Sequence, residues 1–157
     1  TGDDASAHPP RRPFETITLN GHPQTLWPNN CLQDSPGAAL HPDLPWARAA
    51  AIIRKGMDPA SDSYSGFRNN YDARGVRPPT GLEGYLRSRG SADVFVCGLA
   101  RDVCVKWTAL DAAAAGFRVY FIWDATRAVD PAADAIVRTE LSNAGVRSLS
   151  TAQIGGA

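Results

Sequence analysis

The sequence predicts an α/β protein built on a parallel β-sheet, and three observations lead to this prediction. Short apolar runs suited to strands occupy residues 92–98 and 118–124. The stretches that follow them, 103–116 and 131–145, have the length and end signals of helices. The turns between these segments are short. Strands that alternate with helices across short turns form a parallel sheet with right-handed crossovers.

The first part of the chain predicts little regular structure. Residues 1–48 are polar, proline-rich and without sustained periodicity, so we expect mostly loop with at most short elements there. The apolar run AAAIIR, residues 49–54, predicts the first strand. A loop rich in Gly, Ser and Asn is expected at 56–70, and a helix from Thr80 to Arg89.

The remaining elements follow in regular alternation. ADVFVCG (92–98) is typical of a buried strand, and VCVKWTALDAAAAG (103–116) of a helix that ends at its final glycine. RVYFIWD (118–124) predicts a second strand. PAADAIVRTELSNAG (131–145) begins with a proline suited to a helix start and ends with Asn-Ala-Gly, and the following VRSLST predicts a last strand.

Composition limits the class of protein and its partners. With 157 residues, 43% of them hydrophobic, the chain is long enough for one domain, residues 1–157, around one core. The 16 Lys and Arg balance the 16 Asp and Glu, so no basic field draws in nucleic acid. No apolar run is long enough for a membrane span and no signal-peptide pattern is present, so no membrane partner is expected. The 3 cysteines lack disulfide or zinc spacing, which favours the cytoplasm.

Cys104 is the candidate nucleophile. It follows the end of a predicted strand and lies in the first turn of a predicted helix, where ligands bind in open α/β sheets and where helix amides favour a thiolate. Lys55 follows the run 49–54 and would place an ammonium group at the same sheet edge. The alternatives are a small buried thiol and a solvated turn lysine. Cys31 and Cys97 are interpreted as structural.

Three sequence blocks resemble a known family. WPNNCLQDSPGAALHP (27–42), IIRKGMDPASDSYSGF (52–67) and GLARDVCVKWTALDAAAAGFRVYFIWDAT (98–126) are similar, in order and spacing, to signature blocks of the nicotinamidases, also called pyrazinamidases, within the isochorismatase-like cysteine hydrolases. The resemblance implies a doubly wound, Rossmann-like parallel sheet flanked by helices. It also implies hydrolysis of nicotinamide to nicotinate and ammonia in NAD salvage, through a thioester on Cys104.

The same resemblance assigns roles around the nucleophile. Lys55 matches the family's catalytic lysine, which lies beside the thiolate and the reacting carbonyl. The peptide between Leu99 and Ala100 matches the family's cis bond, and the amides of Ala100 and Cys104 match its oxyanion hole.

Ring and metal positions are implied as well. Trp27 and Tyr64 match aromatic residues that wall the pyridine ring, although Trp27 beside a proline is also typical of loop packing. The family holds a divalent metal, Zn or Fe, and Asn30 stands where its W-P-x-H-C motif has a ligand histidine. Asp3 or Asp4 is the candidate for a third, variable ligand position.

Two family motifs have no counterpart in this sequence. The D-x-Q-x-D-F motif that supplies the general base and the D-x-H motif that supplies metal ligands are missing, so we expect a domain that is N-terminally incomplete and lacks its first two strands. Those strands would lie between the runs 49–54 and 92–98.

Alternatives to a nicotinamidase therefore stay open. One is a non-catalytic remnant or assembly subunit of the same fold, and another is an isochorismatase-like amidohydrolase for a different amide or carbamoyl substrate. The expected partners are nicotinamide and either a second copy of the chain or a complementing N-terminal segment.

Overall fold

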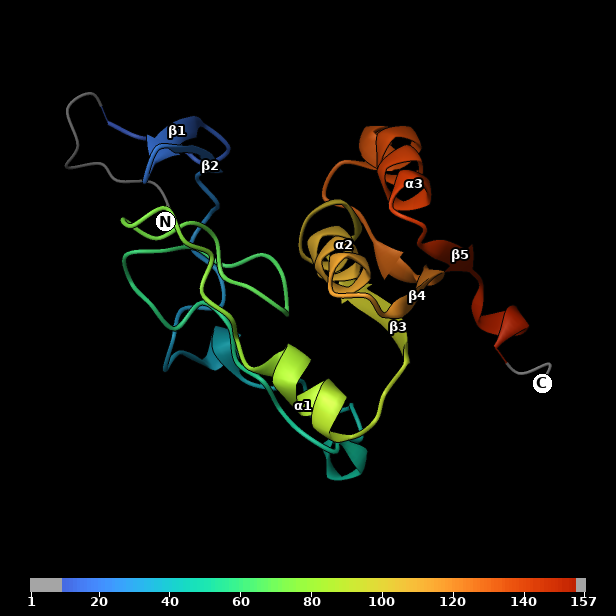
Figure 1. Cartoon of the computed structure of the whole chain (residues 1–157). Helices are drawn as coiled ribbons and strands as arrows, with labels where there is room; N and C mark the ends of the chain where they lie inside the picture. The colour runs from blue at the N-terminus through green and yellow to red at the C-terminus, as the bar shows by residue number, and fades with distance from the viewer. Residues whose placement is uncertain (1–9, 155–157) are drawn as a thin grey trace.

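The second half of the chain forms a parallel sheet covered by two helices. The computed structural model describes residues 10–154. The sheet has 3 strands in the order β3-β4-β5, and α2 and α3 pack side by side on one of its faces (Figure 1). In chain order the elements are β3 (Asp93–Leu99), α2 (Lys106–Ala114), β4 (Arg118–Arg127), α3 (Asp134–Asn143) and β5 (Arg147–Leu149). Both pairings are parallel, which confirms the predicted alternation of strand and helix.

The first half of the chain is mostly irregular. A hairpin of β1 (Thr16–Leu19) and β2 (His22–Thr25) turns at Asn20 and Gly21, which both have positive φ, 53° and 80°. Positive φ at both central residues defines the type I′ turn, whose twist suits a tight hairpin. The remaining regular element before the sheet is α1 (Leu82–Ser88), which lies inside the predicted helix, and some one-turn 3₁₀ segments accompany it.

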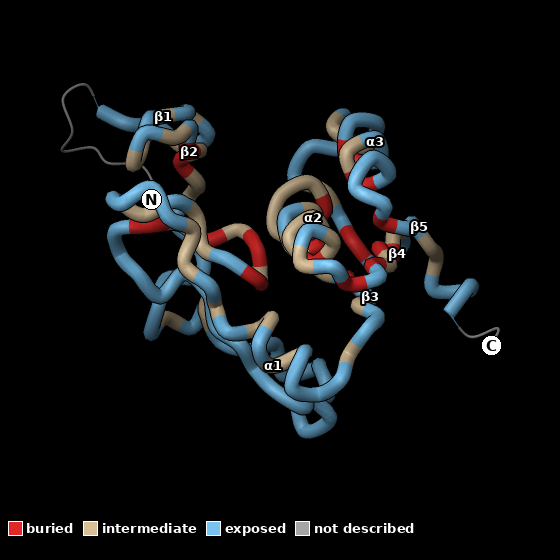
Figure 2. Tube along the Cα trace, in the orientation of Figure 1, coloured by how far each residue is buried: buried red, intermediate tan, exposed pale blue. Residues whose placement is uncertain are grey.

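The hydrophobic core lies between the sheet and its two helices. Figure 2 shows buried residues gathered where α2, α3 and β4 meet. Ala109 and Ala112 of α2 face Phe121 of β4, and Val137 and Leu141 come from α3. Small residues on α2 bring the helix close to the strands, and each large buried side chain contributes about 1.5–3 kcal/mol. No helix within residues 10–154 is long and apolar enough to cross a membrane.

Phe67 attaches the irregular half of the chain to this core. Its side chain is 1% exposed and packs edge-on against Phe117, with ring centroids 5.9 Å apart. Phe67 follows a loop in which Ser61, Ser63 and Ser65 are also buried. This single aromatic contact therefore fixes the loop that carries the candidate residue Tyr64 against α2 and β4.

The predicted first strand at 49–54 is wrong. The segment is exposed and has no strand hydrogen bonds. The amide of Ala49 donates to the carbonyl of Trp46 at 2.9 Å, and the hydroxyl of Tyr85 donates to the carbonyl of Ala50 at 3.2 Å. An apolar run becomes a strand only when a neighbouring segment pairs with it. Within residues 10–154 no segment pairs with this run, so the periodicity alone misled the prediction.

β3 is a strand, as predicted, but it is not buried. Only Val96 is buried, at 8% exposed, whereas Phe95 is 52% and Leu99 73% exposed. β3 forms one edge of the 3-stranded sheet, and no other strand of the described chain pairs with its free edge. An exposed edge with apolar side chains is a template for pairing with another chain.

We expect residues 1–157, expressed alone, to self-associate through β3. Phe95→Lys should shift the protein toward monomer, because an edge lysine opposes strand addition. Size exclusion with light scattering measures this. The control is Ile136→Lys, which adds the same charge at an exposed position on α3 and should leave the association state unchanged. A parent chain that elutes as a monomer at all concentrations would contradict the prediction.

Candidate active site

Cys104 lies in a wide turn between β3 and α2. The π-helical segment η3 (Arg101–Val105) begins directly after β3 and leads into α2, and the thiol is partly exposed. The peptide between Leu99 and Ala100 is cis, and Ala100 is the residue immediately before η3. The carbonyl of Ala100 accepts from the amides of Val103 at 3.2 Å and Val105 at 3.0 Å. The structure therefore places the thiol at the carboxyl end of a parallel strand, where ligands bind in such sheets.

Lys55 reaches this thiol from the other half of the chain. Its Nζ lies 3.8 Å from Sγ of Cys104 and also donates to the carbonyl oxygen of Ser63 at 2.5 Å. The prediction that these two side chains meet is therefore right in geometry, although the segment before Lys55 is not a strand. An ammonium group this close to sulfur provides a cation for the negative charge that forms in the site during nucleophilic attack.

The side chains of Trp27 and Tyr64 lie next to each other and together form an aromatic wall. Nε1 of Trp27 donates to the hydroxyl oxygen of Tyr64 at 3.0 Å, and the two rings are nearly perpendicular, at 84° with centroids 6.2 Å apart. Edge-to-face packing of this kind is a favoured aromatic geometry. Both residues are partly buried, so each retains some surface that a flat ring can contact.

Sequence reasoning missed the polar residues that hold this wall. Gln24 is 4% exposed, and its Nε2 contacts the hydroxyl of Tyr64 and Oδ2 of Asp62, each at 2.7 Å. Nδ2 of Asn70 donates to Oε1 of Gln24 at 3.1 Å, which fixes the amide orientation. These residues lie in polar loops where sequence gives no periodic signal, so only the tertiary structure reveals them.

The environment of Tyr64 raises the pKa of its hydroxyl above the usual 10.0. Burial is the main cause, since it disfavours the charged phenolate, and the nearby carboxylate of Asp62 adds to the effect. Hydrogen bonds from Trp27 and Gln24 act in the opposite direction and are outweighed. Tyr64 therefore remains neutral across the physiological pH range.

Thr108 ties the Tyr64 loop to the nucleophile turn. Its hydroxyl accepts from the amide of Gly66 at 2.8 Å and donates to the carbonyl oxygen of Cys104 at 2.6 Å. One side chain on α2 thus contacts both the loop that carries the aromatic wall and the residue that carries the thiol. This relay fixes their separation.

The described residues do not fit the metal that the resemblance implies. Asn30 is exposed, and residues 10–154 contain no group of three or more His, Cys, Asp or Glu that could hold a metal ion. A lone amide oxygen is a poor ligand for Zn or Fe, which favour imidazole and thiolate. Asp3 and Asp4 lie outside the described residues.

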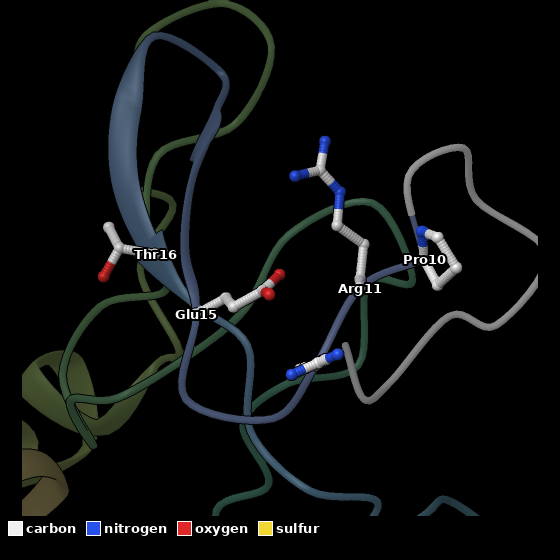
Figure 3. Close-up of a pocket in the computed structure, with 5 residues that line it drawn as sticks. Pro10, Arg11, Glu15 and Thr16 are labelled. Carbon is white, nitrogen blue, oxygen red and sulfur yellow. The ribbon is translucent and has the colours of Figure 1, made fainter.

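Two hollows on the surface of the described residues are not lined by Cys104 or Lys55. One, of about 500 Å³, lies by the β1–β2 hairpin and is lined by exposed or half-exposed residues, Pro10, Arg11, Arg12, Glu15 and Thr16 (Figure 3). A second, of about 340 Å³, is lined in part by Tyr64, Arg77 and Trp107. The side-chain chemistry, rather than cavity size, therefore marks the candidate site.

Comparison with known proteins agrees with the fold. The family model of the isochorismatase domain matches residues 20–153, so the chain belongs to the isochorismatase family. It is 46% identical over 126 residues to a nicotinamidase from Acinetobacter baylyi, which covers 80% of this chain.

Solved structures of nicotinamidases are also similar. The Acinetobacter baumanii nicotinamidase/pyrazinamidase superposes with a TM-score of 0.86 at 40% identity, covering 96% of this chain and 71% of that one. PnC1 from L. infantum, solved in complex with nicotinate, has a TM-score of 0.75 at 46% identity, covering 82% of this chain and 62% of that one. A Pyrococcus horikoshii pyrazinamidase in complex with zinc has a TM-score of 0.67 at 34% identity, with 80% and 64% covered.

The chain spans only part of the relatives it matches. It covers 57% of the length of the Acinetobacter baylyi nicotinamidase. What the comparisons establish for this chain is therefore the family and the fold. The activity and the substrate are taken up below as proposals.

The proximity of Lys55 predicts a reactive thiol at Cys104. We expect iodoacetamide at neutral pH to label Cys104 faster than Cys31 or Cys97, even though those two are more exposed, because the ammonium group of Lys55 lies 3.8 Å from its sulfur and attracts the negative charge of the attacking sulfur. Lys55→Met should slow Cys104 labelling about fivefold and leave the other two unchanged. Peptide mapping by mass spectrometry measures all three sites, and equal labelling would refute the assignment.

The raised pKa of Tyr64 predicts a loss of stability at high pH. As the pH rises above 10.0, the Tyr64 hydroxyl loses its proton in the unfolded chain before it does so in the folded chain. The contribution of the raised pKa to the free energy of unfolding is therefore complete below the unfolded-state pKa and is lost as the pH rises through the folded-state pKa. Tyr64→Phe should remove this loss, whereas Tyr71→Phe keeps Tyr64 and should retain it. Urea unfolding at about pH 8 and about pH 11 measures the difference. Identical alkaline losses in the parent and Tyr64→Phe would contradict the stated cause.

Proposed function

We propose that the protein of this chain hydrolyses nicotinamide to nicotinate and ammonia. The observation that carries the proposal is the 3.8 Å contact between Lys55 and the thiol of Cys104 at the carboxyl end of β3. A thiol beside an ammonium group, on the turn between a parallel strand and a helix, is suited to attack on an amide carbonyl. Relatives named as nicotinamidases support the choice of amide.

The reaction proceeds through a thioester. Sγ of Cys104 attacks the carbonyl carbon of the amide, the carbon–nitrogen bond breaks, and the thiol proton leaves with the nitrogen as ammonia. Water then attacks the thioester and the carbon–sulfur bond breaks. One water proton restores the thiol, and the hydroxyl stays on the carbonyl carbon as nicotinic acid, which ionises to nicotinate. Lys55 is proposed to stabilise negative charge on Sγ during the reaction, and the amides of Ala100 and Cys104 are proposed to stabilise the carbonyl oxygen as it becomes negative.

The aromatic wall supports a flat heteroaromatic ring as the rest of the substrate. Trp27 and Tyr64 hold each other by the 3.0 Å hydrogen bond, and Gln24 holds Tyr64 from behind. A preorganised wall loses little freedom when a ring stacks on it. The structure of PnC1 from L. infantum with nicotinate supports a pyridine carboxamide over an aliphatic amide.

A non-catalytic assembly subunit is the second candidate. Two observations favour it: β3 has a free, apolar edge, and residues 10–154 supply no metal-binding group. In this case a second copy of the chain or a complementing segment would cover β3. We propose the cytoplasm as the location in either case, because all 3 cysteines are free thiols.

Ammonia release from nicotinamide tests the proposed activity. In the whole polypeptide that carries this sequence, Cys104→Ala should abolish release, whereas Cys97→Ala should retain it, because Cys97 lies on the exposed part of β3 away from Lys55. A trapped thioester on Cys104, seen by intact mass after rapid acid quench, would confirm the intermediate. Absence of both release and thioester in the parent would favour the assembly subunit.

A further inference from the structure

Arg101 is a buried cation at the start of the turn that carries Cys104. Arg101 is 8% exposed and is the first residue of η3. Nε donates to the hydroxyl oxygen of Thr126 at 2.8 Å, and one terminal nitrogen donates to the carbonyl oxygen of the same residue at 3.0 Å. The other terminal nitrogen forms an ion pair with Oδ2 of Asp134 at 2.6 Å. Its guanidinium therefore joins η3 to both β4 and α3.

The flat face of the guanidinium is also occupied. It lies over the ring of Trp123, with 4.3 Å between Cζ and the ring centroid, and Arg138 of α3 contacts the same ring at 3.5 Å. A planar cation over an indole face is favourable, and the rigid fork of arginine fixes the direction of each hydrogen bond. With its edge and its face both engaged, the side chain has one orientation.

Asp102 binds the same segment as Arg101, residues 126–134. Its two carboxylate oxygens accept from the amides of Val129 and Asp130, each at 2.9 Å. At the other end of η3, Val105 is 4% exposed and packs in the core. Cys104 thus lies between a polar clamp, defined as Arg101 and Asp102 bound to residues 126–134, and an apolar anchor.

We propose that Arg101 is a positioning residue that sets the direction of the Cys104 thiol. Stability alone does not account for this clamp, because its ion pair is only partly buried, with 33% of the Asp134 side chain exposed, and such a pair adds little net stability. What a buried arginine with four fixed contacts provides is a defined backbone geometry. Through the backbone of η3, that geometry determines whether Sγ meets Lys55. The inference rests on the proposed function only in taking Cys104 as the nucleophile.

The test compares the clamp with a matched ion pair at the other end of the same sheet. Arg101→Met/Asp134→Asn removes both charges of the clamp, and Arg118→Met/Asp93→Asn removes a pair of equal length, 2.6 Å, that joins β4 to β3. In the whole polypeptide, the readout is the iodoacetamide labelling rate of Cys104 divided by that of Cys97. We expect the ratio to fall about tenfold in the clamp variant, by the sensitivity of reactive groups to small misplacement, and to be unchanged in the control.

Two milder variants keep the test informative if the double variant folds poorly. Thr126→Val removes one acceptor while keeping side-chain volume, and Arg101→Lys keeps the charge without the fork; both should give intermediate ratios with cooperative melting. An unchanged ratio in every folded variant, or labelling of both cysteines that rises together, would overturn the proposal. The labelling ratio does not depend on amide turnover. A parent protein without nicotinamidase activity would therefore refute the proposed function, while the labelling ratio would still test the role of Arg101. Where turnover occurs, kcat should fall with KM unchanged.

Discussion

The site depends on how β3 passes into α2. A parallel strand delivers its carboxyl end to the ligand edge of the sheet, and the next residues decide which side chain stands there. In this chain one short segment places Cys104 there, because the carbonyl of Ala100 accepts the hydrogen bonds that close the turn and Val105 packs in the core. The position of the Cys104 thiol therefore depends on the path of the main chain as much as on its own side-chain conformation. Lys55 arrives from a distant loop, so its contact with Sγ depends on the loop being held at Ser63 and at Phe67.

Most of the sheet and the identity of the central pair were predictable from sequence. Residues 93–99, 106–114 and 118–127 are regular because strand and helix signals are local, and the sequence blocks that contain Lys55 and Cys104 predicted that the two side chains meet. The run 49–54 was not predictable, because strand formation is a property of two segments and periodicity reads only one. The apolar pattern of 92–98 predicted a buried strand, whereas the predicted lack of two strands beside it is consistent with the open edge of β3.

The supporting shell of the site shows a different limit of sequence. Gln24 and Asn70 lie in unrelated loops and are joined only by folding, so their spacing along the chain carries no signal. Arg101 lies three residues before Cys104 in the sequence, yet its partners Thr126 and Asp134 lie 25 and 33 residues away from it. Reactive side chains are recognisable by type, whereas the residues that aim them are ordinary polar residues recognisable only by contact.

The hydroxyl of Thr108 has a consequence for sequence drift in this protein. It needs both an acceptor lone pair for the amide of Gly66 and a proton for the carbonyl of Cys104, and its methyl group lies 3.4 Å from where a Cβ on Gly66 would stand. Valine at 108 would keep the shape and lose both hydrogen bonds, whereas serine would keep both. A contact of 3.4 Å is an ordinary van der Waals distance, and Leu82 lies equally close to the same point. Position 108 is therefore expected to vary only between threonine and serine across lineages, independently of position 66.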